Sequence, residues 1–389
     1  MRNKRSVCII GAHGTPNIGD QSILIGLIHL LRSDQSTGGI KIISRNPKLI
    51  RTYVDEPEMF PGNSFFYLRT FFLVAKCDEL ILGGGGIIQD QTSLANLMYY
   101  VAYIMLAGLL RKKIRAIGVG VGPFRYSVSR LFVRLAFSFV SEIIVRDDSS
   151  RTRLQTIIGE RTPVRVCPDP AFLLSPQGSG GQSSVMPHHG QSMRLGINLR
   201  PWLYRLGGLW PVAGRIRHQK WEPEFSACMD VLANELKKFN DVQPVTLVMM
   251  PMESFQDTLA LSILLNKLSA EKIPVERPRI GTPAELLRAY QSIHAMIGMR
   301  YHSLIFSIIT HRPFIALSYT DKVRSLVQGL GWAEFEVPFE AQAMKRIGPM
   351  LQALVADFPQ LQERLRIYDQ QCQKHLRALG HSSRDHEKQ

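Results

Sequence analysis

Short, almost wholly apolar segments alternate with longer helical patterns along most of this chain. In the first part, strands are expected at Val7–Gly11, Ile40–Ser44, Glu79–Gly83, Ile114–Val119, Glu142–Val145 and Val164–Cys167. Their apolar character is nearly continuous, which is typical of strands whose two faces are both covered by helices. Because a helical pattern separates each strand from the next, the alternation favours a parallel, doubly wound sheet.

The same alternation restarts after Ser175–Met193, a stretch rich in Gly, Ser and Gln that cannot bury enough apolar surface to fold. Strands are expected beyond it at Leu195–Leu199, Val245–Met250, His294–Gly298 and Phe314–Ser318. We therefore predict two sequential α/β domains joined by one linker, and a C-terminal helix, kinked at Pro359, that packs back onto the main body. The expected boundaries are 1–175, linker 176–193, 194–340 and helical segment 341–380.

Positive charge is spread through both predicted domains. The 389 residues contain 47 Lys and Arg against 32 Asp and Glu, a net charge of +15. Of these, 22 basic and 13 acidic residues precede residue 175, and 25 and 19 follow. Because neither a basic tail nor a nucleic-acid-binding motif is present, we expect no nucleic-acid partner. A phosphorylated small substrate and an anionic membrane surface remain as partners.

The cysteines and apolar segments indicate the compartment. Five scattered cysteines without a C-x-x-C pair argue against a disulfide framework or a cysteine zinc site, and favour a reducing compartment. Val7–Ile10 is too short for a signal-peptide core, and Leu97–Leu110 is too short to span a bilayer. We expect a cytoplasmic protein without metal or cofactor, with peripheral contact at the inner face of the plasma membrane as an option.

Three glycine-rich turns are expected at the carboxyl ends of three strands. Glycine lets the backbone approach a ligand closely, and a helix after such a turn offers its N-terminus to an anion. Carboxyl ends of parallel strands share one edge, so a binding crevice is predicted there. The candidate binding residues in the first two turns are Asn17, Gly19, Asp20, Gly84, Gly85 and Gly86, with Asp90 just beyond as a candidate base; Gly118–Pro123 forms the third.

The first turn has neither the spacing of a dinucleotide fingerprint nor the Lys-Ser/Thr of a P-loop. An ordinary tight turn, with Asp20 as a helix cap, is the alternative for that segment. A flexible turn is the alternative for the four glycines.

Polar side chains also follow strands of the second half. Asn198 and Arg200 come at the end of Leu195–Leu199, and Arg300 and His302 follow His294–Gly298. Arginine suits bidentate contacts to carboxylate or phosphate, and histidine donates a proton near neutral pH. Lys322 follows the last strand and could add positive charge to the same crevice. The alternatives are a core histidine with satisfied hydrogen bonds and a solvated surface lysine.

One stretch, Trp202–Trp221, combines three tryptophans with arginines and a lysine. Aromatic rings beside cations suit sugar stacking or a membrane headgroup layer. An irregular packed loop is the alternative.

In their order, these motifs resemble the polysaccharide pyruvyl transferase family. The resemblance covers about residues 7–332. It is carried by Asn17-x-Gly19-Asp20, Leu82–Gly86 with Asp90, Gly118–Pro123, Arg146-Asp147, Pro168-Asp169-Pro170, Arg300-Tyr301-His302 and Pro313…Tyr319-x-x-Lys322. It implies two Rossmann-like halves facing each other across a cleft, as in GT-B glycosyltransferases.

The resemblance also implies an activity: transfer of pyruvate from phosphoenolpyruvate onto sugar hydroxyls as a cyclic ketal. The acceptor would be a cell-surface glycan or its lipid-linked precursor. Arg300 and His302 would serve donor binding and catalysis, and Asp90 and Arg200 match the family's acidic and second arginine residues. His302 is the expected general acid and Asp90 the expected base, while Arg200, Arg300 and Lys322 would hold the donor.

Two other classes stay open. A GT-B-type glycosyltransferase would use a nucleotide-sugar donor. A non-catalytic binder of anionic glycans or lipids would use Trp202–Trp221 instead of the glycine-rich rim.

Overall fold

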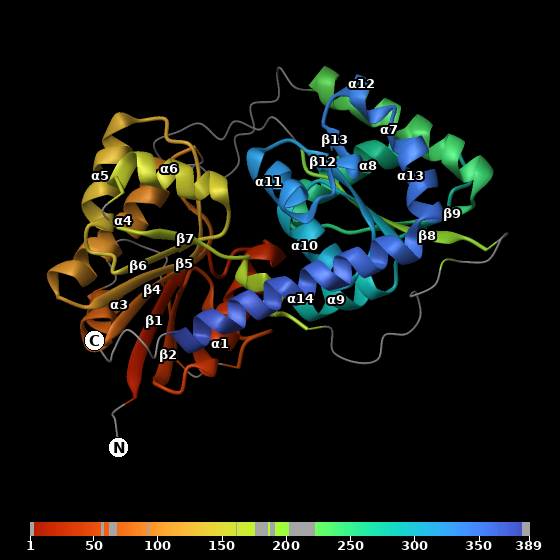
Figure 1. Cartoon of the computed structure of the whole chain (residues 1–389). Helices are drawn as coiled ribbons and strands as arrows, with labels where there is room; N and C mark the ends of the chain where they lie inside the picture. The colour runs from red at the N-terminus through yellow and green to blue at the C-terminus, as the bar shows by residue number, and fades with distance from the viewer. Residues whose placement is uncertain are drawn as a thin grey trace.

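The computed structural model describes residues 4–55, 58–61, 68–91, 93–160, 162–175, 186, 191–201 and 222–382. Two α/β bodies lie side by side, and one long C-terminal helix runs across both (Figure 1). Most of the predicted linker 176–193 and all of Trp202–Trp221 lie outside the described residues.

The first sheet has seven parallel strands in the order β3-β2-β1-β4-β5-β6-β7. They are β1 (Arg5–Gly11), β2 (Thr37–Ser44), β3 (Glu58–Pro61), β4 (Glu79–Ile88), β5 (Lys113–Val121), β6 (Glu142–Val145) and β7 (Val164–Val166). The helices are α1 (Ile18–Ser33), α2 (Pro47–Ile50), α3 (Leu68–Lys76), α4 (Leu94–Leu109), α5 (Ser127–Phe137) and α6 (Asp148–Ile158), with the 3-10 turn η1 (Pro170–Leu173).

The second sheet has six parallel strands in the order β10-β9-β8-β11-β12-β13. They are β8 (Met193–Asn198), β9 (Val245–Met249), β10 (Val275–Glu276), β11 (Ala295–Gly298), β12 (Phe314–Ser318) and β13 (Glu336–Pro338). Its helices are α7 (Glu222–Val242), α8 (Ser254–Lys267), α9 (Pro283–Gln291), α10 (Tyr301–Ile309), α11 (Asp321–Leu330), α12 (Ala341–Met344) and α13 (Ile347–Ala356), with η2 (Ala333–Phe335). The predicted pair of parallel, helix-covered sheets is confirmed.

Both faces of the first sheet are buried, as the continuous apolar strands predicted. Along β1, Val7 and Ile9 belong to one hydrophobic cluster, and Cys8 and Ile10 to another. Successive side chains of a strand point to opposite faces, so each face has its own core. The cluster on the α1 face continues into the second half, so one apolar core joins the two bodies.

The glycine run does not begin after a strand, as expected, but lies within β4. Gly84 and Gly85 adopt φ values of 51° and 83°, and the pairing with β5 shifts between Gly85 and Ile88. Glycine tolerates positive φ without a Cβ penalty, so the strand bulges here and continues. In the same way β5 runs through Gly118, at φ 66°, to Val121.

Two helices, α13 and α14 (Phe358–Ser382), stand where one helix kinked at Pro359 was predicted. α13 ends at Ala356, and after the single residue Asp357 α14 begins, with Pro359 in its first turn. Proline is tolerated there because that N–H has no partner inside the helix. As predicted, α14 packs back onto the body. The ring of its Tyr368 packs edge-on against the ring of Phe172 in η1, with 6.2 Å between the ring centroids.

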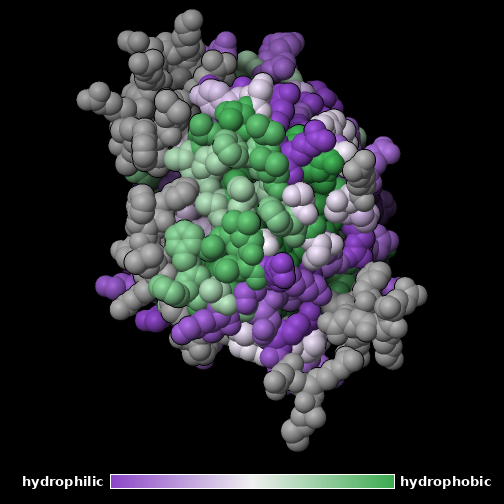
Figure 2. Space-filling model, turned by 90° about the vertical axis from the view of Figure 1, so that its left-hand side faces the viewer, coloured by the Kyte–Doolittle hydropathy of each residue, from purple (hydrophilic) through white to green (hydrophobic). Residues whose placement is uncertain are grey.

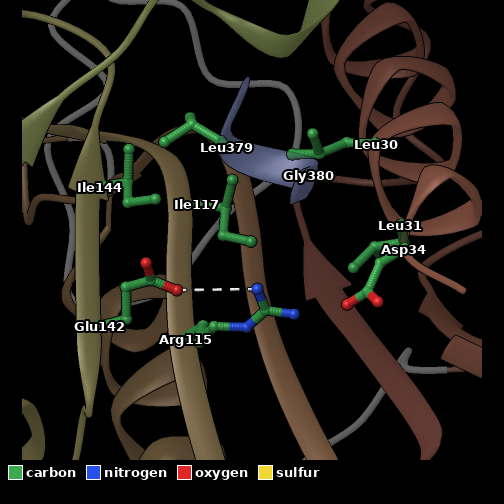
Figure 3. Close-up of a pocket in the computed structure, with 9 residues that line it drawn as sticks. All are labelled: Leu30, Leu31, Asp34, Arg115, Ile117, Glu142, Ile144, Leu379 and Gly380. Atoms are coloured by element: carbon green, nitrogen blue, oxygen red, sulfur yellow. Dashed lines mark ion pairs between the residues drawn. The ribbon is translucent and has the colours of Figure 1, made fainter. Parts of the chain in front are cut away.

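The far end of α14 reaches the first sheet. Leu379 and Gly380 close a small pocket between α1 and the amino ends of β5 and β6 (Figure 3). Arg115 on β5 and Glu142 on β6 form an ion pair of 3.6 Å in that pocket. Within the described ranges, no helix combines the length and apolarity needed to cross a bilayer.

Candidate active site

The carboxyl ends of the two sheets meet. The backbone N–H of Ile18, which opens α1, donates to the carbonyl of Met252 after β9 at 3.0 Å. The Arg153 side chain of α6 pairs with Asp321 of α11 at 2.5 Å. Both contacts join residues from opposite halves, so the carboxyl ends of the two sheets lie against each other.

His302 lies at the centre of this junction, in the first turn of α10. Its imidazole packs against Gly19 of α1 so closely that a Cβ on Gly19 would lie 2.2 Å from Nδ1. On the other side, Nε2 is 3.5 Å from a carboxylate oxygen of Asp169. The imidazole from the second half is therefore held between two elements of the first.

Asp169 is fully buried and caps η1 by accepting the N–H of Ala171 at 3.0 Å. Burial alone would raise its pKa, but the hydrogen bond and charge of His302, together with the charge of Arg146, lower it overall. Asp169 is therefore a carboxylate that can orient the histidine.

Arg146 explains Gly120, the middle glycine of the third predicted motif. Its guanidinium lies against β5, where a Cβ on Gly120 would be 2.6 Å from Nη2. The same group stands 4.9 Å from the centre of the Tyr301 ring and 3.9 Å from Asp169. Only a glycine leaves room for this buried cation, which comes directly after β6.

Asp20 lies beside this cluster. Its carboxylate accepts hydrogen bonds from Thr15 at 3.2 Å and Asn17 at 3.0 Å. Asn17 is the cap of α1, accepting the N–H of Gly19 at 3.1 Å, so Asp20 is not the cap. Burial raises the pKa of Asp20, although the charge of His302 opposes the shift.

The three candidate glycines of β4 face α1 and Arg146. A Cβ on Gly84 would meet the Ile23 side chain at 1.8 Å, and one on Gly85 would lie 3.3 Å from Asp20. Gly86 is exposed, and a Cβ on it would lie 3.6 Å from Nη2 of Arg146. Gly84 and Gly85 therefore let α1 approach the sheet, and Gly86 borders the cluster.

Arg300 is anchored within the second half. Its Nε donates to the buried carboxylate of Asp257 at 2.8 Å, and its Nη2 contacts the same group. The Arg300 backbone N–H donates to the Asn198 side chain at 3.0 Å, and Asn198 in turn donates to the carbonyl of Met250 at 2.9 Å. Asn198 and Asp257 thus fix the turn that presents His302.

Arg200, Tyr319 and Lys322 form a further basic group. Nη1 of Arg200 donates to the Tyr319 hydroxyl at 3.2 Å. Burial would raise the pKa of Tyr319, but the charges of Arg200 and Lys322 outweigh it and lower the pKa to about 8. Burial and the charges of Arg146 and Arg200 lower the pKa of Lys322. Arg146 of the first half and Arg200 of the second therefore both lower the pKa of Lys322.

Asp90 lies apart from these contacts. Its buried carboxylate accepts the backbone N–H groups of Arg125 at 2.6 Å and Tyr126 at 3.1 Å, in the loop before α5. Both oxygens are engaged in holding that loop.

The contacts thus bring together Asn17, Gly19, Asp20 and His302, and they join Arg300 to Asn198 and Arg200 to Tyr319. The charge of Lys322 also acts on Tyr319. Arg146, Asp169 and Asp257 were not predicted as site residues. A signal existed for the first two, because each comes directly after or near the end of a strand, β6 or β7. Asp257 sits inside α8, and nothing in its local sequence marks it.

Solved structures share this architecture. An Anabaena protein, Alr3699/HepE, solved with UDP-glucose, matches with a TM-score of 0.60 at 11% identity, covering 97% of this chain and 99% of that one. The UDP-GlcNAc 2-epimerase of Neisseria meningitidis, solved with UDP-GlcNAc, matches with a TM-score of 0.58 at 11% identity over 96% and 97%. The predicted GT-B-like arrangement is therefore confirmed.

Sequence comparison identifies the family. The chain belongs to the polysaccharide pyruvyl transferase family, whose model matches residues 17–321. It is also 23% identical over 377 residues to the amylovoran biosynthesis protein AmsJ of Erwinia amylovora, covering 84% of this chain and 86% of that protein. The resemblance seen in the motifs is thereby confirmed.

The contact between Gly19 and His302 predicts a non-additive pair of substitutions. Gly19→Ala should lower the free energy of unfolding by about 1–3 kcal/mol, because the new methyl group displaces the imidazole. In a His302→Ala background the space is open, and alanine, the better helix former, should be neutral or stabilising. Urea unfolding of the four proteins measures both effects; an equal cost in both backgrounds would contradict the packing.

Proposed function

We propose that this chain transfers pyruvate from phosphoenolpyruvate to two hydroxyls of a sugar, forming a cyclic ketal and releasing phosphate. The single observation that carries the proposal is the group of cations around Lys322. Its pKa is lowered by burial and by Arg146, Arg200 and Arg300, although the Tyr319 side chain opposes this shift. Cations that repel one another in a buried place are stabilised by an anion of high charge, and phosphoenolpyruvate carries about three negative charges.

In the proposed donor complex, Arg200 and Lys322 contact the phosphate or carboxylate directly. Arg300, whose Nε and Nη2 already bind Asp257, contributes its charge and holds the turn. Arg146 adds charge from the first half. Arginine is favoured for such contacts because its planar fork matches both anionic groups.

His302 is the proposed general acid. It gives a proton to the methylene carbon of the donor, which leaves an oxocarbenium-like centre at the next carbon. A sugar hydroxyl attacks that centre and loses its proton to a base. Phosphate then leaves, and the second hydroxyl closes the ring and gives its proton to His302. Asp169 lies 3.5 Å from the imidazole and can orient it.

For the base, Asp20 is the stronger proposal, although Asp90 was predicted from the sequence. Burial raises the pKa of Asp20 above the ordinary value of an aspartate, although the nearby charge of His302 lowers it in part. The carboxylate is therefore a stronger base than an ordinary aspartate. Both oxygens of Asp90 accept backbone N–H groups, which favours a role in fixing the loop before α5.

The acceptor proposed is a glycan or a lipid-linked oligosaccharide. The name of the Erwinia relative, an amylovoran biosynthesis protein, supports a role in polysaccharide synthesis. A lipid-linked acceptor would favour a cytoplasmic enzyme at the inner face of the plasma membrane. The predicted contact through Trp202–Trp221 falls on residues outside the described ranges.

A nucleotide-sugar glycosyltransferase is the second candidate, favoured by the fold shared with proteins solved with UDP-sugars. Thermal unfolding separates the two. Phosphoenolpyruvate at about 100 times its Kd should raise Tm by about 2–4 °C, because it binds only the folded state. Lys322→Gln should lose this shift. A shift with UDP-sugars but none with phosphoenolpyruvate would replace the proposal with the second candidate; no shift with either would favour the non-catalytic binder.

Substitutions at the acid and at the two carboxylates separate their roles. His302→Ala should fold normally and lose turnover by about 10²–10⁴-fold. Asp20→Asn should cause a loss of the same order, whereas Asp90→Asn should mainly lower Tm. Phosphate release in the presence of acceptor measures turnover. Near-normal turnover of His302→Ala would remove it as the acid, and a larger loss in Asp90→Asn than in Asp20→Asn would restore Asp90 as the base.

Donor binding should depend on the Tyr319 proton. Because its pKa is lowered to about 8, the phenol is neutral below that pH and becomes an anion above it. That negative charge repels the donor, so KM for phosphoenolpyruvate should rise as the pH passes through about 8. In Tyr319→Phe this rise should be absent. A KM that is flat over this range in the unsubstituted protein, or that rises equally in both, would contradict the assignment.

A further inference from the structure

An apolar patch covers the outer face of the first half. Figure 2 shows it as a continuous green area on the side that lies to the left in Figure 1, over α3, α4 and α5. We call it the α5 face and define it by six exposed side chains: Phe72, Leu109, Val128, Leu131, Leu135 and Phe139. Contiguous apolar areas of this kind on a folded protein mark interaction sites.

The sequence of α5 makes it apolar on two sides. Ser129, Val133, Ala136 and Phe137 are buried against the body. Val128, Leu131 and Leu135 recur at spacings of three and four residues and project outward, with exposed fractions of 46%, 54% and 46%. A helix that needs only its inner stripe for the core has no reason within the fold to carry a second apolar stripe.

The segment that forms α4 and α5 is strongly basic. From residue 91 to residue 141 the chain contains no Asp or Glu but has seven basic residues: Arg111, Lys112, Lys113, Arg115, Arg125, Arg130 and Arg134. Arg130 and Arg134 are exposed on α5, one residue before Leu131 and Leu135, and Arg111 and Lys113 are exposed beyond the end of α4. Arg115 is the buried member.

We propose that the α5 face is a docking surface for an anionic phospholipid membrane. An apolar stripe with exposed arginines on the same helix inserts between lipid headgroups while the cations contact phosphate groups. A second copy of this chain fits less well. A symmetric dimer would set the face against itself and bring Arg130 and Arg134 of both copies together without a carboxylate from this segment.

The inference deepens the proposed function, from which it takes only the lipid-linked acceptor. Tyr126, 41% exposed, lies between the α5 stripe and the carboxyl end of β5. Asp90 holds the backbone N–H of Tyr126 and of Arg125. The docking surface is thus fixed, through Asp90, to the edge of the sheet where Arg146 lies. A membrane bound at α5 would bring a lipid-linked sugar toward that edge.

Vesicle sedimentation of the full chain tests the proposal without any transfer reaction, so docking and catalysis can fail separately. The protein should bind vesicles of phosphatidylcholine with about 30% phosphatidylglycerol, and bind pure phosphatidylcholine at least about 10-fold more weakly. Raising NaCl from about 0.1 M to about 0.5 M should weaken binding by a similar factor. Arg130→Gln/Arg134→Gln should weaken binding about 10-fold to 30-fold and reduce its salt dependence.

Leu131→Glu/Leu135→Glu should abolish binding to the anionic vesicles. The matched control is Val242→Glu/Ile367→Glu, which changes two apolar side chains, exposed by 65% and 44%, on other helices. Both variants should keep the far-UV circular dichroism and Tm of the parent. Equal vesicle binding by both double variants, or binding indifferent to lipid charge and salt, would overturn the proposal. Failure to bind vesicles, with a dimer in light scattering that Leu131→Glu/Leu135→Glu dissociates, would replace the membrane by a second copy.

Discussion

The packing of one imidazole against one glycine determines how the rest of this molecule can be arranged. His302, from the second sheet, fits against α1 only because Gly19 has no side chain. The Ile18–Met252 hydrogen bond and the Asp169 contact lie on either side of it. Together these contacts hold the carboxyl ends of the two sheets against each other. The shared apolar core holds the halves together, and these short polar contacts decide which groups meet between them.

Much of the fold was available from the sequence. Strands with unbroken apolar character and helices between them predicted the two parallel sheets, because period and burial are local properties. The limits of β4 were not predictable in the same way. A run of four glycines is typical of a turn. Here it forms a bulged strand, because it pairs with β5 and packs against α1. The short strands β3, β10 and β13 carry too few residues for a periodic signal.

The candidate site, too, could be predicted only where the local sequence carries a signal. His302, Arg300 and Lys322 could be predicted because each stands near a strand end next to a helix start. Asp257 was missed, although its bonds to Arg300 fix the turn before His302, because pairing across 43 residues leaves no local pattern. For Asp90 the sequence gives the position but not the direction of the carboxylate, and its two N–H partners lie about 35 residues away.

The course of α14 has a consequence for how the protein forms during synthesis. The chain is made from the N-terminus, and domains generally fold as they emerge. Here Leu30 of α1 and Phe172 of η1, both in the first half, are covered by residues of the last helix. Until α14 has been made, the first half therefore exposes an apolar strip that Tyr368, Leu379 and Gly380 later cover. Premature termination within α14 would leave two nearly complete sheets with that strip open to other chains.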